Sequence, residues 1–282
     1  MGVEGQRFQQ LLKAEFIRPE LTIPGMPEVG LRVVRRLADI SATGPQVAKL
    51  VASDPALAGL LLRSANSFDY NPAAEPTTDL NIAVRRIGFD TVRRLTLAYA
   101  LQTVRDAPRY RIVHGRLSAM WQRSVALASL ARAMATRISG VPRERANTAG
   151  LMHTVGHVWV IAKAASSPGV LQDPMHLENL INDWRIPASR RLLQSWGMDP
   201  EFVDAVCDHE AAEEATGTVP ALTDLLFVCQ LFNAYKDAPL ELTKRLASSP
   251  VAARLGLRGR ERELVFSHSA DEVRAVRSAL CD

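Results

Sequence analysis

The segment Ala149–His157 is largely apolar and contains two histidines four residues apart, His153 and His157. Residues four apart on a helix lie on one face, and two imidazoles on one face can bind a divalent metal ion. The segment lacks the glutamate that serves as general base in an HExxH motif, and Gly156 is expected to end or bend the helix between the two rings. We therefore expect a hydrogen-bonded core histidine at position 153 and a partly exposed one at 157.

A second cluster of titratable side chains lies at Asp208, His209 and Glu210. Two carboxylates beside an imidazole could form part of a metal or anion site. The alternative is the exposed C-terminal end of a helix, in which the polar run as far as Glu214 is solvated, and we favour that interpretation. Four side chains from the two clusters are candidates for a small-ligand pocket: His153, His157, Asp208 and His209.

Arginine supplies most of the basic charge, and two adjacent pairs stand out, Arg85-Arg86 and Arg93-Arg94. A guanidinium binds phosphate oxygens through a planar fork of donors, so these pairs could hold an anion such as a nucleotide or nucleic acid. Such pairs are more often solvated or salt-bridged helix faces, and no aromatic residues alternate with them to stack on bases. The net charge of +4 permits an acidic or nucleic-acid partner without requiring one.

Helical periodicity dominates the chain. Apolar residues recur three and four apart, as in Val29–Leu37, whereas strand-like alternation and hairpin signals are scarce. Proline is tolerated at the first position of a helix, and these prolines are each expected to open one: Pro27, Pro55, Pro142, Pro174, Pro187, Pro200 and Pro220. Three aspartates that precede such prolines are expected to be N-caps: Asp54, Asp173 and Asp199. The pattern predicts an all-α fold.

The histidine at 153 stands in a recognisable setting, Ala149-Gly-Leu-Met-His153-Thr154-Val-Gly156. An apolar helix that ends in a histidine followed by a small residue and a glycine resembles the signature of the HD superfamily. In that superfamily an adjacent His-Asp pair binds a divalent metal, which lowers the pKa of a bound water for phosphoester hydrolysis. Here Thr154 stands where the resemblance places the aspartate, and a neutral hydroxyl is a weak ligand for a dication.

The rest of the chain is similar to one branch of that superfamily. Five short motifs follow one another in the order expected of the HDOD family: Leu21–Pro27 (LTIPGMP), Ala52–Leu57 (ASDPAL), Leu62–Ser67 (LRSANS), Ile82–Gly88 (IAVRRIG) and Thr91–Leu95 (TVRRL). The similarity extends from about Leu21 to about Ala234 and is therefore specific. The resemblance implies an all-α, HD-domain/PDEase-like multi-helical bundle with an N-terminal helical subdomain. It also implies a non-catalytic protein of bacterial signalling.

The resemblance allows the other metal positions of the HD superfamily to be compared one at a time. The first ligand histidine is replaced by Arg123 or Ser124, which follow Trp121, and the final aspartate is replaced by Gln230. Only the later histidine, His209, is kept. Guanidinium, hydroxyl and amide groups are unsuited to a divalent cation. We therefore expect no metal, no cofactor and no catalytic residue at the degenerate positions Arg123, His153, Thr154, His209 and Gln230.

The predicted division of the chain follows from the same comparison. Residues 1–20 are expected to form a helical N-terminal extension, and 21–116 the N-terminal helical subdomain. Residues 117–236 are expected to form the HD-like helical core, and 237–282 a helical extension packed on that core.

Three functions remain open at this point. The first is a regulatory module of signal transduction that binds a partner protein or a small ligand. The second is a divergent metal-dependent phosphohydrolase that acts on a nucleotide or cyclic dinucleotide through His153, Asp208 and His209. The third and weakest is nucleotide or nucleic-acid binding by the arginine pairs.

The composition favours a cytoplasmic protein without membrane association. No apolar run is long enough to cross a bilayer, and the first residues contain no apolar signal-peptide core. Three cysteines, Cys207, Cys229 and Cys281, lie far apart and are expected to be reduced thiols.

Overall fold

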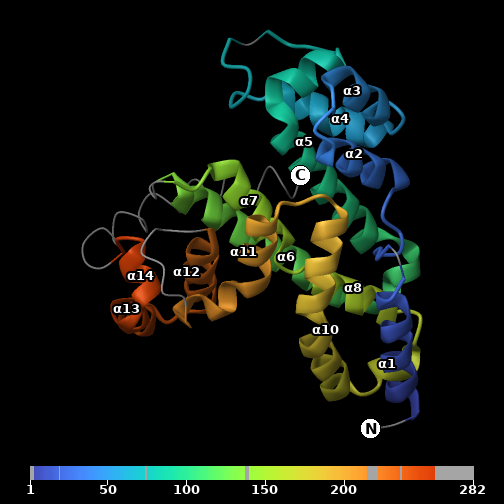
Figure 1. The fold of residues 1–282 in the computed structure, drawn as a ribbon, viewed down its shortest axis with the longest axis vertical. Helices are drawn as coiled ribbons and strands as arrows, with labels where there is room; N and C mark the ends of the chain where they lie inside the picture. The colour runs from blue at the N-terminus through green and yellow to red at the C-terminus, as the bar shows by residue number, and fades with distance from the viewer. Residues whose placement is uncertain are drawn as a thin grey trace. The chain divides into compact units, whose positions relative to one another are not determined.

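The computed structural model describes residues 3–18, 20–73, 75–136, 140–214, 222–235 and 237–257. Helices and turns make up this part of the chain, and no β-strand occurs within it (Figure 1). The all-α prediction is confirmed. No helix among the described residues is long and apolar enough to cross a membrane.

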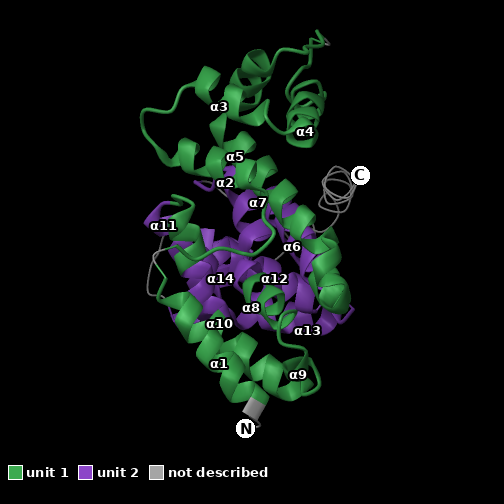
Figure 2. Cartoon of the chain, turned by 90° about the vertical axis from the view of Figure 1, so that its right-hand side faces the viewer, with its two compact units in different colours: residues 1–118, 158–184, 191–198 green, residues 119–157, 185–190, 199–282 purple. Residues whose placement is uncertain are grey.

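The chain forms two compact units, and both are discontinuous in sequence (Figure 2). Unit 1 consists of Met1–Ser118, Val158–Trp184 and Arg191–Met198. Unit 2 consists of the remaining segments, Ala119–His157, Arg185–Arg190 and Asp199–Asp282. The fourfold division from the sequence stays a prediction, and much of its last segment, residues 258–282, lies outside the described residues.

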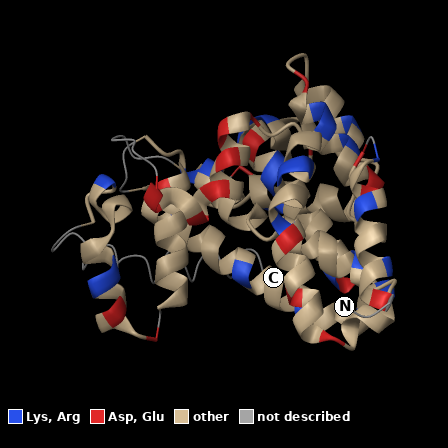
Figure 3. Cartoon of the chain, turned by 60° about the horizontal axis from the view of Figure 1, so that its bottom comes forward, with Lys and Arg blue, Asp and Glu red and all other residues tan. Residues whose placement is uncertain are grey.

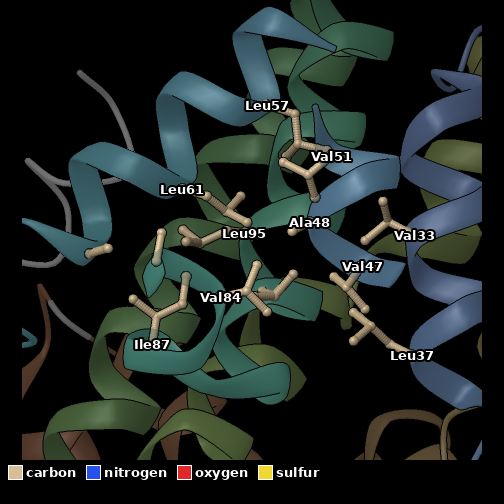
Figure 4. Close-up of a cluster of buried hydrophobic side chains, with 13 residues drawn as sticks. Val33, Leu37, Val47, Ala48, Val51, Leu57, Leu61, Val84, Ile87 and Leu95 are labelled. Carbon is tan, nitrogen blue, oxygen red and sulfur yellow. The ribbon is translucent and has the colours of Figure 1, made fainter. Parts of the chain in front are cut away.

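The helices of unit 1 pack around a cluster of aliphatic side chains (Figure 4). The elements that lie wholly in this unit are α1 (Val3–Phe16), α2 (Glu28–Ala38), α3 (Gly44–Val51), α4 (Pro55–Ala65), α5 (Leu80–Asp106), η1 (Pro108–Val113) and α9 (Pro168–Leu171). Four of them meet in the cluster, where α2 contributes Val33, α3 contributes Val51, α4 contributes Leu61 and α5 contributes Val84. These side chains are almost completely buried, so their removal from water is the main force that holds the four helices together.

The helices of unit 2 include those that carry the candidate ligand positions. The unit contains α7 (Arg143–Met152), α11 (Pro200–Asp208), η2 (His209–Glu214), α12 (Leu222–Ala234), α13 (Pro239–Ser248) and α14 (Pro250–Arg254). Three further helices contribute residues to both units: α6 (His114–Ala135), α8 (Val155–Ala164) and α10 (Pro174–Ser195). An ion pair ties α14 to α12, with 2.6 Å between Arg254 Nη2 and Asp224 Oδ1.

The three aspartate caps are confirmed. The Asp54 carboxylate accepts hydrogen bonds from the backbone N–H groups of Ala56 and Leu57 at the start of α4. Asp173 and Asp199 cap α10 and α11 in the same way. These bonds satisfy N–H groups that would otherwise have no partner in the helix.

One local prediction is wrong. Pro187 lies inside α10 and does not open a helix, and because proline has no N–H, the helix continues there with one hydrogen bond fewer. Asn66 is the C-cap of α4, with φ −94° and ψ −4°. Its side chain explains its presence, because it donates to the Thr77 carbonyl at 2.9 Å and accepts from the Thr77 N–H at 2.8 Å, which closes the following loop.

Candidate functional site

A cleft of about 760 Å³ opens within unit 2. Its walls come from α6, the turn between α7 and α8, α8, α10, η2 and α12. The polar side chains that line it are Gln122, Arg123, His153, Thr154, His157, Arg185, Glu210, Gln230 and Asn233. Four of the five degenerate positions identified in the sequence therefore meet at one cleft, although they are spread over more than a hundred residues.

Two of the positions that the resemblance equates with HD metal ligands are bonded to each other. Ser124 Oγ on α6 lies 2.6 Å from Thr154 Oγ1 in the turn after α7, and both side chains are buried. Each hydroxyl can donate to the other, so the pair satisfies itself without an ion. Of the two residues considered for the first ligand position, Ser124 is the one that faces Thr154.

His209 and Gln230, two further positions of that comparison, are also bonded to each other. His209 is buried, and its Nε2 lies 2.7 Å from the side-chain nitrogen of Gln230 on α12. His209 Nδ1 lies 2.8 Å from the Val206 carbonyl, which can only accept, so Nδ1 carries the proton and Nε2 accepts from the Gln230 amide. Burial lowers the pKa of His209, which keeps the ring neutral.

The prediction of a solvated run after Asp208 is therefore wrong at His209, which is buried although Glu210 beside it is exposed. The reason is that α11 passes directly into the 3-10 helix η2, and this tighter turn directs the imidazole inward towards α12.

His153 occupies the C-cap of α7 and is half-buried. Its Nδ1 lies 2.7 Å from the Gly150 carbonyl and therefore donates, which leaves Nε2 as a hydrogen-bond acceptor. Burial lowers the pKa of His153 to about 3, and the nearby His209, His157 and Arg123 act in the same direction. The His153 ring is therefore neutral at physiological pH.

The helix breaks between His153 and His157, as expected. The break falls at His153 and Thr154, so that His157 belongs to α8. Gly156 does not cause the break. It lies inside α8, where any side chain would collide with the backbone carbonyl of Arg185, and its N–H donates to Ser189 Oγ at 3.0 Å. The glycine thus allows α8 and α10 to approach closely.

The acidic neighbours of His209 are engaged in ion pairs. Both carboxylate oxygens of Asp208 lie 2.8 Å from Arg190 Nη2, and Asp208 does not line the cleft. Glu210 does line it, but forms a two-point pair with Arg185 at 2.8 and 2.6 Å. The hydrogen bonds from Arg185 lower the pKa of Glu210, which therefore stays charged and neutralises the guanidinium.

Arg123 differs from the other charged residues of the cleft. Its side chain is exposed and lines the cleft, as His153 does. It forms no hydrogen bond or ion pair with any other residue that the structure describes. Arg185, Glu210 and Asn233 could not be assigned to the cleft from sequence spacing, because they lie on three different elements.

The arginine pairs of unit 1 are engaged mainly with the backbone. Arg93 Nη2 donates to the Leu37 carbonyl at 2.7 Å, and Arg86 Nη1 donates to the carbonyls of Ala65 and Glu75 at 3.1 and 3.2 Å. Arg94 is buried, which leaves Arg85 as the one exposed member. Basic and acidic positions are interspersed along the helices in the view of Figure 3. The pairs therefore do not converge on one anion.

A family model described as the HDOD domain matches residues 23–212. The chain belongs to the HDOD family. No curated protein matches it. The HDOD match includes unit 1 from residue 23 onwards and the cleft walls as far as Ala212 in η2.

Solved structures with the same fold come from several bacteria. The "Putative metal-dependent phosphohydrolase" of Shewanella amazonensis SB2B has a TM-score of 0.69 at 23% identity, with 98% of this chain and 100% of that one covered. An HDOD domain protein of unknown function from Geobacter sulfurreducens has a TM-score of 0.62 at 19% identity, covering 98% and 97%. The "Putative signal transduction protein" of Marinobacter aquaeolei VT8 has a TM-score of 0.58 at 22% identity, covering 99% and 67%.

The side chains of this HDOD cleft do not fit the divalent metal of the HD superfamily. Among the described residues, no three His, Cys, Asp or Glu side chains come together in a way that could hold a metal ion. The nearest candidates are two histidine nitrogens, one of which is occupied by Gln230, and a guanidinium beside them repels a cation.

Proposed function

We propose that this HDOD protein is a regulatory module that acts by binding and does not hydrolyse phosphoesters. One observation carries the proposal: the positions that correspond to HD metal ligands are bonded to one another, as Ser124–Thr154 and His209–Gln230. A metal would have to break both pairs, and the carboxylate that lines the cleft, Glu210, is already paired with Arg185.

Without a metal, each of the two pairs satisfies hydrogen-bonding groups that are buried. A buried hydroxyl or amide without a partner costs about 1–3 kcal/mol, and the two pairs avoid that cost. The remaining charges at the cleft are Arg123 and the neutralised Arg185–Glu210 pair. No carboxylate there is free to act as general base or to balance a dication. The cleft can bind and position a molecule, but it lacks the groups that activate water.

The expected setting is bacterial signal transduction in the cytoplasm, with a protein partner. The name of the Marinobacter relative agrees with a signalling role, and the free buried thiols Cys207 and Cys229 suit a reducing compartment. The name of the Shewanella relative favours the alternative, a metal-dependent phosphohydrolase. A nucleic-acid function receives no support from the arginine pairs.

A hydrolysis assay separates the proposal from its alternative. The purified chain is incubated with bis(p-nitrophenyl) phosphate and with a cyclic dinucleotide, in the presence of Mn²⁺ or Fe²⁺, beside the His153→Ala variant. We expect the same background rate for both proteins. Metal-dependent turnover by the wild type that disappears in His153→Ala would overturn the proposal.

A further inference from the structure

The charges that line the cleft of unit 2 do not cancel. Arg185 and Glu210 neutralise each other through their two-point pair. His153 is neutral, because its pKa is about 3. Arg123 then leaves one positive charge at the cleft, and no described residue pairs with it.

The hydrogen-bonding groups of the cleft include one that can only accept. His153 Nδ1 is committed to the Gly150 carbonyl, so Nε2 can only accept a hydrogen bond. The amides of Gln122 and Asn233 also line the cleft and can either donate or accept. A ligand that matches this surface carries an oxyanion for Arg123, a hydroxyl or N–H donor for His153, and little apolar surface.

We infer that the cleft binds a small organic oxyanion with hydroxyl groups, in which Arg123 holds the phosphate or carboxylate and His153 accepts from a hydroxyl. The inference rests on the proposed function, since Arg123 would then act where the superfamily uses a metal to hold an anion. A volume of about 760 Å³ suits a small molecule. A guanidinium binds either type of oxyanion through two parallel hydrogen bonds.

Two substitutions change the charge of the cleft in opposite directions. Arg123→Gln removes the unpaired cation, and Glu210→Gln keeps an oxygen acceptor for Arg185 but removes the charge that neutralises it. The first should weaken oxyanion binding by roughly tenfold to a hundredfold. The second should strengthen binding by about threefold to tenfold, because Arg185 becomes a second attractive charge.

Arg143→Gln is the matched control. Arg143 is an exposed arginine of the same unit, it does not line the cleft, and it has no hydrogen bond or ion pair with another described residue. Arg143→Gln changes the net charge of the protein by the same amount as Arg123→Gln. A difference in binding between these two variants therefore does not come from the net charge.

Isothermal titration of the four proteins with inorganic phosphate, ribose 5-phosphate and citrate tests the inference. We expect ribose 5-phosphate or citrate to bind more tightly than inorganic phosphate, and the variants to rank as Glu210→Gln, then wild type and Arg143→Gln together, then Arg123→Gln. Preference for ribose 5-phosphate identifies a phosphate headgroup, and preference for citrate a carboxylate.

Two results would overturn the inference: no binding of any probe up to about 10 mM, or equal weakening by Arg123→Gln and Arg143→Gln. Neither result affects the proposed function. Conversely, metal-dependent hydrolysis in the assay above would defeat the proposed function even if Arg123 bound an oxyanion.

Discussion

Arg86 and Arg93 of unit 1 are used in the opposite way to Arg123 of unit 2. In unit 1, Arg86 and Arg93 donate to main-chain carbonyls that lie far away in sequence, and so connect α5 to the end of α4, to the loop after α4 and to the end of α2. In unit 2, Arg123 reaches into a cleft and donates to no described residue. The sequence offered the adjacent arginines as a possible anion site, but of these three arginines Arg123 is the one that has no partner among the described residues.

The hydrogen-bond partners of an arginine, and not its neighbours in sequence, therefore decide whether it stabilises the fold or can bind a ligand. A guanidinium bonded to buried carbonyls stabilises the fold and cannot turn towards a ligand without leaving those carbonyls unsatisfied. The same contrast occurs within unit 2. Ser124 and Thr154 satisfy each other, whereas Arg123 has no partner among the described residues.

The largest effect on stability should come from substituting an arginine of unit 1 that donates to the main chain. Arg93→Met removes the donor to the Leu37 carbonyl, and we expect the free energy of unfolding to fall by about 2 kcal/mol. Urea denaturation measures the change. Arg85→Met is the control, because Arg85 is exposed, and it should change stability by less than about 0.5 kcal/mol. Equal effects would remove the distinction between the two kinds of arginine.

The hydrogen bond between Ser124 and Thr154 can be removed by one substitution or by two. Ser124→Ala leaves Thr154 Oγ1 without its partner and should lower the free energy of unfolding by about 1–2 kcal/mol. Adding Thr154→Val replaces the second hydroxyl with a methyl group of similar size and should recover most of that loss. A double-mutant cycle by chemical denaturation measures the coupling, and additive losses would mean that the two hydroxyls do not depend on each other.

A smaller effect, a change in stability with pH, should come from His153, whereas Arg123 stays charged. The folded pKa of His153, about 3, lies below its ordinary value of 6.5, so the stability it contributes is complete above pH 6.5 and is lost as the pH falls towards 3. We expect a loss of about 1 kcal/mol between pH 7 and pH 6, less in His153→Gln. Identical pH profiles for the two proteins would show that His153 is not held neutral by the fold.

Much of the fold was predictable from local patterns. Apolar periodicity and the aspartates that precede prolines act over one or two turns of helix, so Asp54, Asp173 and Asp199 could be assigned as caps without knowing the tertiary structure. Pro187 shows the limit of that reasoning, because the surrounding α10 tolerates a proline that a local rule would place at a helix start.

The site was predictable only where a family motif marks it. The resemblance identified His153, Thr154, His209 and Gln230 as related positions, and the structure brings them together. It gave no sign that Ser124 and Thr154, or His209 and Gln230, bond to each other, since these contacts depend on how α6, α7, η2 and α12 pack. The burial of His209 next to exposed Glu210 could not be read from a polar run either.

Titration of the purified protein with Mn²⁺ in a calorimeter shows whether this cleft works without a metal. We expect no saturable binding stronger than about 1 mM, because Ser124 is bonded to Thr154, His209 is bonded to Gln230, and Arg123 repels a cation. Binding of one equivalent of Mn²⁺ with a micromolar Kd, lost in His153→Ala, would contradict it.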